Sequence, residues 1–391
     1  MISFEEAYKI VMASAKTTGA ERIPFTNASG RILAEDVFSD TDMPPFNRSA
    51  VDGYACKTAD LGMDLEMMEV VAAGREPLTE VGTGQCSKIM TGAIVPEGCD
   101  IVFMVEDSEV MPSGKIRFTG TSLKPNISIQ GEDVKKGQLV LEKGKHILPQ
   151  DIAVIASFGH VSVLVSKKPG VAVISTGDEI IEPENKPARS QIRNSNAYQL
   201  LAQTEAAGGR GKYYGIAPDT GDTAFEIISR ALSENDIVVL TGGVSMGDFD
   251  FIPSFLARAG VKILFNRINV QPGKPTTFGI HPKAIVFGLP GNPVSSFIQF
   301  ETLIKPVIRK MSESNQKQYS FELPLGVKYE RKSASRMGWI PVRLSAKNEV
   351  IPVEYHGSAH ITSLSYSDGI ISIMPEVTSL EKGTLVTYRP F

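Results

Sequence analysis

Short apolar runs alternate with segments of helical spacing between residues 168 and 310. The clearest runs, Val171–Ile174 and Ile237–Leu240, are rich in β-branched residues and contain no polar position. Such runs are typical of strands that are buried on both faces of a parallel sheet. Two further strands are expected at 262–265 and 284–287, and helices at 196–207, 220–233, 251–259 and 294–310. Strands that alternate with helices predict a mostly parallel α/β domain with right-handed crossovers.

The chain on either side of this region has different periods. Residues 3–18 have helical spacing, and 149–158 predict a second short helix. Between residues 65 and 140, short apolar runs are separated by Gly, Pro and Asn, which predicts an all-β segment. A polar linker at 312–319 precedes residues 320–391, which have no helical pattern and predict a small β domain. The predicted fold class is therefore α/β plus β, in a multidomain chain.

Composition and charge exclude several classes of protein. The chain has 391 residues, of which 42% are hydrophobic, a net charge of −4 and a pI of about 5.9. This balance favours neither nucleic acid nor a membrane as a partner. No apolar run could span a bilayer and the N-terminus does not resemble a signal peptide, so we expect a cytoplasmic protein. Cys56, Cys86 and Cys99 form no CxxC pair, which indicates reduced thiols.

Polar and glycine residues follow the run at 237–240. Thr241-Gly242-Gly243 ends the run, and Ser245, Asp248 and Asp250 come next. Two glycines allow a sharp turn and a close approach of ligand to backbone. Ligands in open α/β sheets bind at the carboxyl ends of the strands. An ordinary tight turn with solvated acids is the alternative for this stretch taken alone.

Other loops that follow predicted strands carry similar side chains. Asp178 and Glu179 follow the first run, Asp219 and Asp222 lie in a later loop, and Lys274 lies in a Gln-Pro-Gly-Lys-Pro stretch. Each acid alone is more simply a solvated loop residue. Together, several carboxylates, one lysine and glycine-rich backbone suit a metal-bound phosphate ester. Walker and GxGxxG motifs are absent, no His/Cys cluster indicates zinc, and Ser245 has no evident His partner.

Nine short motifs, spread from Pro44 to Ile370, resemble one protein family. They are PPFNRSAVDGYA (44–55), TGA (91–93), PEGCD (96–100), GED (131–133), STGDE (175–179), TGGVSMGDFD (241–250), QPGKP (271–275), GLPGNPVSS (288–296) and GSAHITSLSYSDGI (357–370). In this order they resemble the MoeA family of molybdopterin molybdenumtransferases, which also includes the E domain of gephyrin. The resemblance covers essentially the whole chain.

The resemblance implies an elongated homodimer of four-domain subunits. The N-terminal domain is expected at 1–41 and 134–167, with a β-rich domain inserted at 42–133. A MogA-like, doubly wound α/β domain that binds molybdopterin is expected at 168–311, and a small C-terminal β-barrel at 318–391. The homodimer further implies that the loop at 44–55, with Asp52, serves the cleft of the partner subunit.

The same resemblance implies the reaction. The family inserts molybdenum, supplied as molybdate, into adenylylated molybdopterin and releases AMP in a step that depends on Mg²⁺. The pathway implies a MogA-type adenylyltransferase and downstream molybdenum cofactor enzymes as partners.

Site residues are also implied by motif position. The catalytic set is Asp52, Thr91, Asp133, Glu179, Asp219, Asp250 and Lys274. The substrate-binding set is Gly242, Gly243, Ser245, Gly273, Pro275, Pro290, Gly291, Asn292, Pro293, Arg343 and Ser358. The metal-binding set is Asp178, Glu179 and Asp250. Gln271 departs from the second lysine of some members, and His360 matches no family position.

Three alternatives remain open at this stage. Because the α/β domain also resembles MogA-type enzymes, adenylyl transfer from ATP is the second hypothesis for an enzymatic reaction. A gephyrin-like scaffold that binds receptor peptides belongs to a different class, and the absence of a fused MogA-like domain argues against it. A preference for tungstate over molybdate depends on small differences in the pocket.

Overall fold

The computed structural model describes residues 1–121, 123–218, 222–243, 252–354, 357 and 359–391. The chain forms two compact units. Unit 1 comprises Met1–Glu35, Lys143–Leu148 and Ser162–Phe391, and unit 2 comprises Asp36–Glu142 and Pro149–Val161. These units are coarser than the four predicted domains, whose boundaries stay a prediction. Among the described residues, no helix combines the length and the apolar composition that crossing a bilayer requires.

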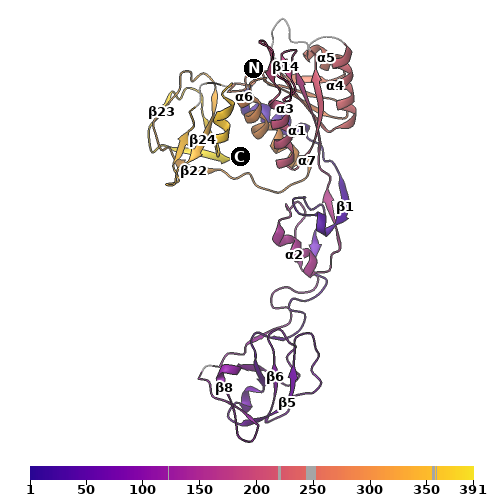
Figure 1. Cartoon of the computed structure of the whole chain (residues 1–391), viewed down its shortest axis with the longest axis vertical. Helices are drawn as coiled ribbons and strands as arrows, with labels where there is room; N and C mark the ends of the chain where they lie inside the picture. The colour runs from indigo at the N-terminus through magenta and orange to yellow at the C-terminus, as the bar shows by residue number, and fades with distance from the viewer. Residues whose placement is uncertain (122, 219–221, 244–251, 355–356, 358) are drawn as a thin grey trace. The chain divides into compact units, whose positions relative to one another are not determined.

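A six-stranded sheet forms the centre of unit 1 (Figure 1). Its order is β16 (Arg210–Ala217), β13 (Gly170–Thr176), β17 (Ile237–Thr241), β21 (Ile285–Leu289), β20 (Thr277–Ile280) and β18 (Lys262–Phe265). The first four strands are parallel, and β20 runs antiparallel to both of its neighbours. Every residue of β13, β17 and β21 is buried. The predicted doubly buried strands and the mostly parallel sheet are confirmed.

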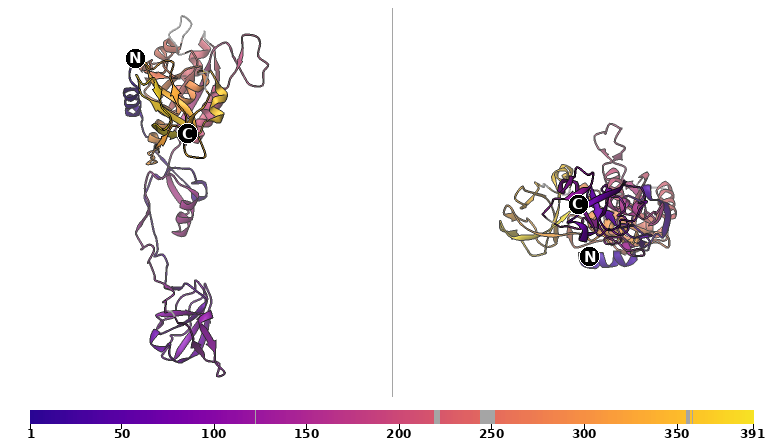
Figure 2. Two further views of the ribbon diagram at one scale, coloured as in Figure 1. Left: turned by 90° about the vertical axis from the view of Figure 1, so that its left-hand side faces the viewer. Right: turned by 90° about the horizontal axis from the view of Figure 1, so that it is seen from below.

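Helices cover both faces of this sheet because alternate strand residues point in opposite directions. Val171 and Val173 belong to an apolar cluster on one face, whereas Ala172 and Ile174 belong to a cluster on the other. Helices α1 (Phe4–Ser14), α3 (Asn196–Ala206), α6 (Pro293–Gln299) and α7 (Lys305–Met311) contribute to the first cluster, and α4 (Asp222–Glu234) and α5 (Ile252–Arg258) to the second. Figure 2 shows α1, in indigo, beside the N-terminus.

Two predicted helices differ from the observed ones. The helix expected at 3–18 ends at Ser14, because Ala15 is extended and Thr18 bonds instead to the carbonyls of Lys167 and Met311. The long helix expected at 294–310 is divided by a π-helical turn at Phe300–Ile304. Pro306 follows that turn and has no N–H to donate, which explains why the regular hydrogen-bond pattern is interrupted there.

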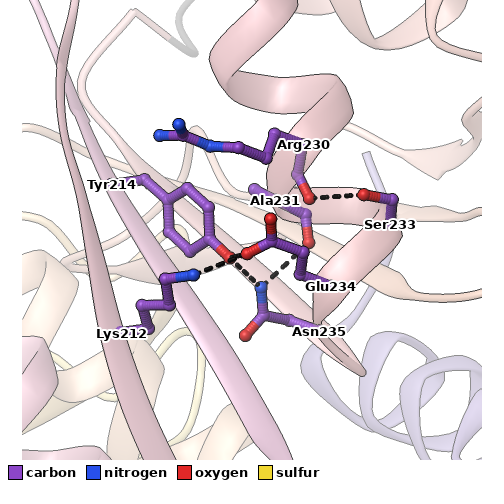
Figure 3. A network of polar contacts seen from close by, with 7 residues as sticks. All are labelled: Lys212, Tyr214, Arg230, Ala231, Ser233, Glu234 and Asn235. Carbon is purple, nitrogen blue, oxygen red and sulfur yellow. Dashed lines mark hydrogen bonds and ion pairs between the residues drawn. The ribbon is translucent and has the colours of Figure 1, made fainter.

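A polar network ties the edge strand β16 to the end of α4 (Figure 3). Glu234 accepts hydrogen bonds from Lys212 and from the Tyr214 hydroxyl, both at 2.5 Å. Asn235 donates to the same hydroxyl at 2.7 Å. The Lys212 hydrogen bond, followed by the Tyr214 one, lowers the pKa of the Glu234 carboxyl. The Lys212–Glu234 ion pair is exposed and adds little stability, whereas the Tyr214 and Asn235 side chains are buried and hold the end of the helix against the strand.

The C-terminal part of unit 1 is a second six-stranded sheet. Its strands are β19 (Val270–Gln271), β24 (Met337–Leu344), β26 (Gly369–Ile373), β28 (Leu385–Pro390), β22 (Phe321–Pro324) and β25 (Val350–Pro352). Trp339 is fully buried and meets the ring of Phe4 edge to face at 5.2 Å. In the sequence, β19 lies between β18 and β20 of the first sheet, so one stretch of chain contributes strands to both sheets. The predicted C-terminal β structure is confirmed, and its described residues include a 3-10 helix, η5 (Ile361–Tyr366).

Unit 2 contains a six-stranded sheet of its own. The order is β7 (Ile101–Met104), β4 (Gly53–Cys56), β6 (Gln85–Ile89), β5 (Asp64–Val71), β9 (Ile116–Phe118) and β8 (Ser108–Val110). Cys56, Cys86 and Tyr54 lie in its apolar core. Short pairs β2 (Val37–Phe38) with β11 (Leu139–Leu141) and β3 (Arg48–Ser49) with β10 (Ile127–Ser128) complete the unit together with helix α2 (Pro149–Ser157). The predicted β-rich segment is confirmed.

Candidate active site

A cleft of about 720 Å³ lies at the carboxyl ends of the central strands of unit 1. Strands β13 and β17 end in residues that line it, and the loop directly after β21 lines it from Pro290. Ala359 and Ile361, from the C-terminal part of unit 1, line it as well. Of the sequence-predicted site residues, the cleft brings together Glu179, Gly242, Gly243, Pro275, Pro290, Gly291, Asn292 and Pro293. The expected position at the strand ends is therefore observed for these eight.

The glycines of the cleft allow its loops to approach each other closely. Gly242 and Gly243 have φ of +95° and +55°. A side chain on Gly242 would overlap the backbone oxygen of Thr176 at the end of β13. The nearest atom to a Cβ on Gly291 would be the Cα of Gly242, at 3.7 Å. The loops that follow these strands thus meet backbone against backbone, and the Gly242 N–H donates to the Leu289 carbonyl at 3.1 Å.

Asn196, the first residue of α3, joins two of these loops. Its side-chain N–H₂ donates to the Thr241 hydroxyl at 2.9 Å and to the Gly291 carbonyl at 2.8 Å. Its side-chain oxygen is buried and has no partner among the described residues. Because Asn196 also lines the cleft, it holds the ends of β17 and β21 in register around the candidate site.

Asn194 similarly orders the loop between β13 and α3. Its side-chain oxygen accepts the Ser175 hydroxyl at 2.9 Å, and its N–H₂ donates to the Tyr213 hydroxyl at 2.7 Å. Tyr213 donates to Glu182 at 2.7 Å. Burial, with the Glu182 hydrogen bond second, raises the pKa of Tyr213, so the phenol stays protonated and can donate. Neither asparagine was among the predicted site residues. The sequence feature that could have indicated them is the polar run at 193–196, which lies at the start of the helix that follows a buried strand.

Only some of the predicted carboxylates lie among the described residues. Glu179 lines the cleft, whereas Asp178 is exposed, outside the cleft lining, with interactions of its own. Asp219, Ser245, Asp250 and Ser358 lie outside the described residues. Within the described ranges, no group of three or more His, Cys, Asp or Glu could hold a metal. The donor chemistry of Glu179 nevertheless fits Mg²⁺, which takes one or two carboxylates and fills its other positions with water and phosphate oxygens.

The loop around Lys274 is held rigidly beside the cleft. Gly273 has φ +105°, and a side chain there would collide with the buried amide of Gln299. Thr276 closes the turn by donating its hydroxyl to the Gly273 carbonyl at 2.7 Å. Pro275 lines the cleft, while Gly273 is buried behind the turn and Lys274 is exposed outside the lining. The structure thus places the loop at the cleft and leaves the ammonium group in solvent.

Two predicted catalytic residues meet in unit 2. One carboxylate oxygen of Asp52 accepts the backbone N–H and the hydroxyl of Thr91. These two hydrogen bonds, the backbone one first, lower the pKa of the Asp52 carboxyl. Asp133 is exposed, and its backbone N–H donates to the Met43 carbonyl at 3.0 Å. In unit 1, Arg343 is exposed on β24 and does not line the cleft.

Family models match most of the chain. A model of the MoeA N-terminal region (domain I and II) matches residues 2–159. A probable molybdopterin binding domain matches residues 172–310, the part that carries the central sheet and most of the cleft. A model of the MoeA C-terminal region (domain IV) matches residues 324–391.

Curated relatives and solved structures agree with these matches. The chain is 37% identical over 318 residues to a molybdopterin molybdenumtransferase of Staphylococcus epidermidis, covering 79% of this chain and 76% of that protein. It is 36% identical over 319 residues to the Bacillus subtilis protein of the same name, covering 79% and 74%. A MoeA crystal structure from Pyrococcus horikoshii has a TM-score of 0.86 at 29% identity and covers 100% of both chains.

Proposed function

This chain belongs to the MoeA family and has a role in molybdenum cofactor biosynthesis, and on that premise we propose that it is a molybdopterin molybdenumtransferase. Its substrates are molybdate and adenylylated molybdopterin. The two dithiolene sulfurs of molybdopterin replace oxygens of molybdate, which leave as water, and a water oxygen attacks the phosphoanhydride to the adenylyl group so that AMP leaves.

The cleft at the ends of β13, β17 and β21 is the observation that supports this proposal most. Its volume of about 720 Å³ is in the range of pockets that take ligands of this size. Gly243 and Gly291 bring backbone close to the cleft, where their N–H groups can face phosphate oxygens, whereas the N–H of Gly242 donates to the Leu289 carbonyl. Asn196 and Asn194 hold the surrounding loops and reduce the ordering cost on binding.

The charged residues have separate proposed roles. Glu179 presents a carboxylate to the cleft, and Lys274 supplies positive charge from the neighbouring loop. Asp178 and Asp250 complete the proposed metal-binding set with Glu179. When bound there, Mg²⁺ would polarise the phosphoryl group and neutralise charge on its oxygens. The Thr91 hydrogen bonds lower the pKa of the Asp52 carboxyl below its ordinary value, which already lies well below neutral, so its proposed role is that of an acceptor and not of an acid.

The assembly and location are also proposals that rest on family membership. We propose a homodimer in the cytoplasm that receives adenylylated molybdopterin from a MogA-type enzyme and passes the cofactor to downstream enzymes. Light scattering of the purified chain tests the dimer. A monomer that remains fully active at the measured concentration would contradict it.

Incubation of the purified protein with adenylylated molybdopterin, molybdate and Mg²⁺ tests the reaction. AMP should appear in step with protein-bound molybdenum, and chelation of Mg²⁺ should slow both. Tungstate in place of molybdate measures the choice of oxoanion. A parallel incubation with ATP and molybdopterin tests adenylyl transfer, for which the probable molybdopterin binding domain at 172–310 is the supporting observation. Adenylylated product in that reaction alone would replace the transferase proposal.

A further inference from the structure

A second cavity of about 340 Å³ lies in unit 1 and shares no lining residue with the cleft. The turn at 29–32, the end of β12 (Ser162–Ser166) and the last turns of α3 and α7 meet there. We call it the Arg309 pocket. The residues that matter for its chemistry are Arg31, Ser166, Lys168, Glu205 and Arg309.

Arg309 enters this pocket without a counter-charge. It lies on the last turn of α7, and within the described ranges its guanidinium makes no ion pair or hydrogen bond. Glu301, the acid that influences it electrostatically, already binds Lys305 at 2.7 Å and Gln203 at 2.8 Å. Burial lowers the pKa of Arg309, although the group remains charged. Its planar set of N–H donors is therefore open to an acceptor from outside the chain.

Ser166 supplies a second open polar group. The residue is only 4% exposed, and its hydroxyl oxygen has no partner among the described residues. Its backbone is already engaged, since its carbonyl accepts Arg31 at 2.9 Å and its N–H donates to Ile32 at 2.8 Å. A buried hydroxyl without a hydrogen bond is costly, so a polar ligand in the pocket would be stabilised by it.

The acceptors around the pocket are largely satisfied. Helix ends carry partial negative charge, which would favour a cation if their carbonyls were open. Here the last-turn carbonyls of α3 and α7 accept backbone N–H groups; those of α3 are Gln203, Thr204 and Glu205, and those of α7 are Ile308, Arg309 and Lys310. The open groups of the pocket are consequently donors.

The charge balance points the same way. Arg31 is paired with Glu21, which does not line the pocket. Lys168 and Glu205 are 3.9 Å apart and both exposed, so this pair is loose. Within the described part of the chain, Arg309 remains an uncompensated, half-buried cation in a pocket that the open Ser166 hydroxyl also lines.

We propose that the Arg309 pocket binds a small tetrahedral oxoanion of the phosphate and sulfate class. Arg309 donates two parallel N–H groups to two oxygens of the anion, and the Ser166 hydroxyl donates to a third. Lys168 adds positive charge at the rim. Since the pocket joins the turn at 29–32, β12 and α7, the anion stabilises the contact of these three segments. This site is independent of the transferase reaction.

Calorimetric titration with inorganic phosphate, with ionic strength held constant by chloride, tests the proposal on the full chain. The wild type should bind phosphate, and Arg309→Gln should weaken binding by about tenfold or more, as expected for a lost charge-assisted hydrogen bond. Lys274→Ala removes the positive charge proposed to bind anions at the cleft and should leave phosphate binding at the Arg309 pocket unchanged. Sulfate titrations of the same variants show which of these two oxoanions the pocket prefers.

The proposal is overturned if the wild type binds no phosphate beyond the chloride control, or if Arg309→Gln binds phosphate as tightly as the wild type. Should Arg309→Gln fail to fold by circular dichroism, Ser166→Ala decides: weaker binding supports the site, and unchanged binding refutes it. AMP release should be the same in wild type and Ser166→Ala, so loss of the anion site and failure of the transferase proposal give different results.

Discussion

Asp52 accepts two hydrogen bonds from Thr91 through one carboxylate oxygen, at 2.6 Å from the backbone nitrogen and 2.7 Å from the hydroxyl. The two residues are far apart in sequence, and adjacent strands β4 and β6 bring them together. Gly53, next to Asp52, has no room for a side chain because a Cβ would overlap the Phe103 carbonyl. The loop end is thereby held in one conformation, with the second carboxylate oxygen of Asp52 available to a ligand.

Replacing Thr91 by Val should raise the pKa of Asp52 part of the way to its ordinary value. The backbone hydrogen bond, which is the larger cause of the lowering, remains in this variant, while the hydroxyl is lost. Carbon NMR of the carboxyl group during an acid titration measures the change. Asp100 is a matched control, because it accepts the N–H and hydroxyl of Thr58 at 2.6 and 2.9 Å and its pKa is lowered in the same way.

The sign of the stability effect follows from the direction of this shift. A lowered folded-state pKa stabilises the fold above the unfolded value of about 4, and this contribution is lost as pH falls through the folded value. The melting temperatures of wild type and Thr91→Val should therefore differ at neutral pH and converge in acid. A difference that grows as pH falls would contradict the assignment.

Glu179→Gln should slow AMP release by roughly tenfold to a hundredfold, as expected when a charged ligand to substrate or metal is lost. The side chain is exposed in the cleft, so thermal melting should not change. Glu184→Gln is the matched control, since Glu184 is an exposed acid of the same loop that does not line the cleft and has no proposed role. We expect a smaller effect from it. Equal turnover in Glu179→Gln and wild type would remove Glu179 from the reaction.

Asn196→Ala should destabilise unit 1 by about 1–3 kcal/mol, because the Gly291 carbonyl and the Thr241 hydroxyl each lose a buried donor. Substrate affinity should fall as well, since the loops that line the cleft lose their tie. Urea denaturation and binding assays measure the two effects. The exposed neighbour Tyr198→Phe, which loses only its bond to Glu182, serves as the control on α3. If Asn196→Ala is as stable as the wild type, Asn196 does not hold the loops after β17 and β21 together.

Lys274→Ala should weaken molybdate binding more than Lys274→Arg, because arginine keeps the charge and changes only the donor geometry. Rising salt should reduce anion affinity in the wild type and have less effect in the alanine variant. Calorimetry at two salt concentrations makes this comparison. The clamp role is rejected if wild type and Lys274→Ala bind equally at both concentrations.

The three cysteines should resist thiol reagents while unit 2 is folded. Burial raises the pKa of Cys56 and Cys99 to about 12 and that of Cys86 to about 11, so little reactive thiolate is present at pH 8. A coloured disulfide reagent should react slowly in buffer and fully in denaturant. Rapid labelling of the native protein would show that these thiols are accessible.

The sequence by itself determined the elements whose pattern is local. Continuous apolar runs predicted β13 and β17, since a strand buried on both faces needs no polar position. Gly242 and Gly243 predicted the tight turn, and their positive φ values confirm it. The motifs from 44 to 370 indicated the MoeA family, and the eight cleft-lining residues were chosen on that basis.

Only the tertiary structure decided which side chains act together. Asn196 is ordinary at the start of a helix, and its link to Thr241 and Gly291 exists because sheet pairing brings two distant strand ends beside α3. The same holds for Asp52 and Thr91, which meet through the pairing of β4 with β6. Ser166 and Arg309 line the same pocket only because the tertiary structure packs α7 near the end of β12. Periodicity reports which face of an element is buried, whereas long-range pairing sets what that face meets.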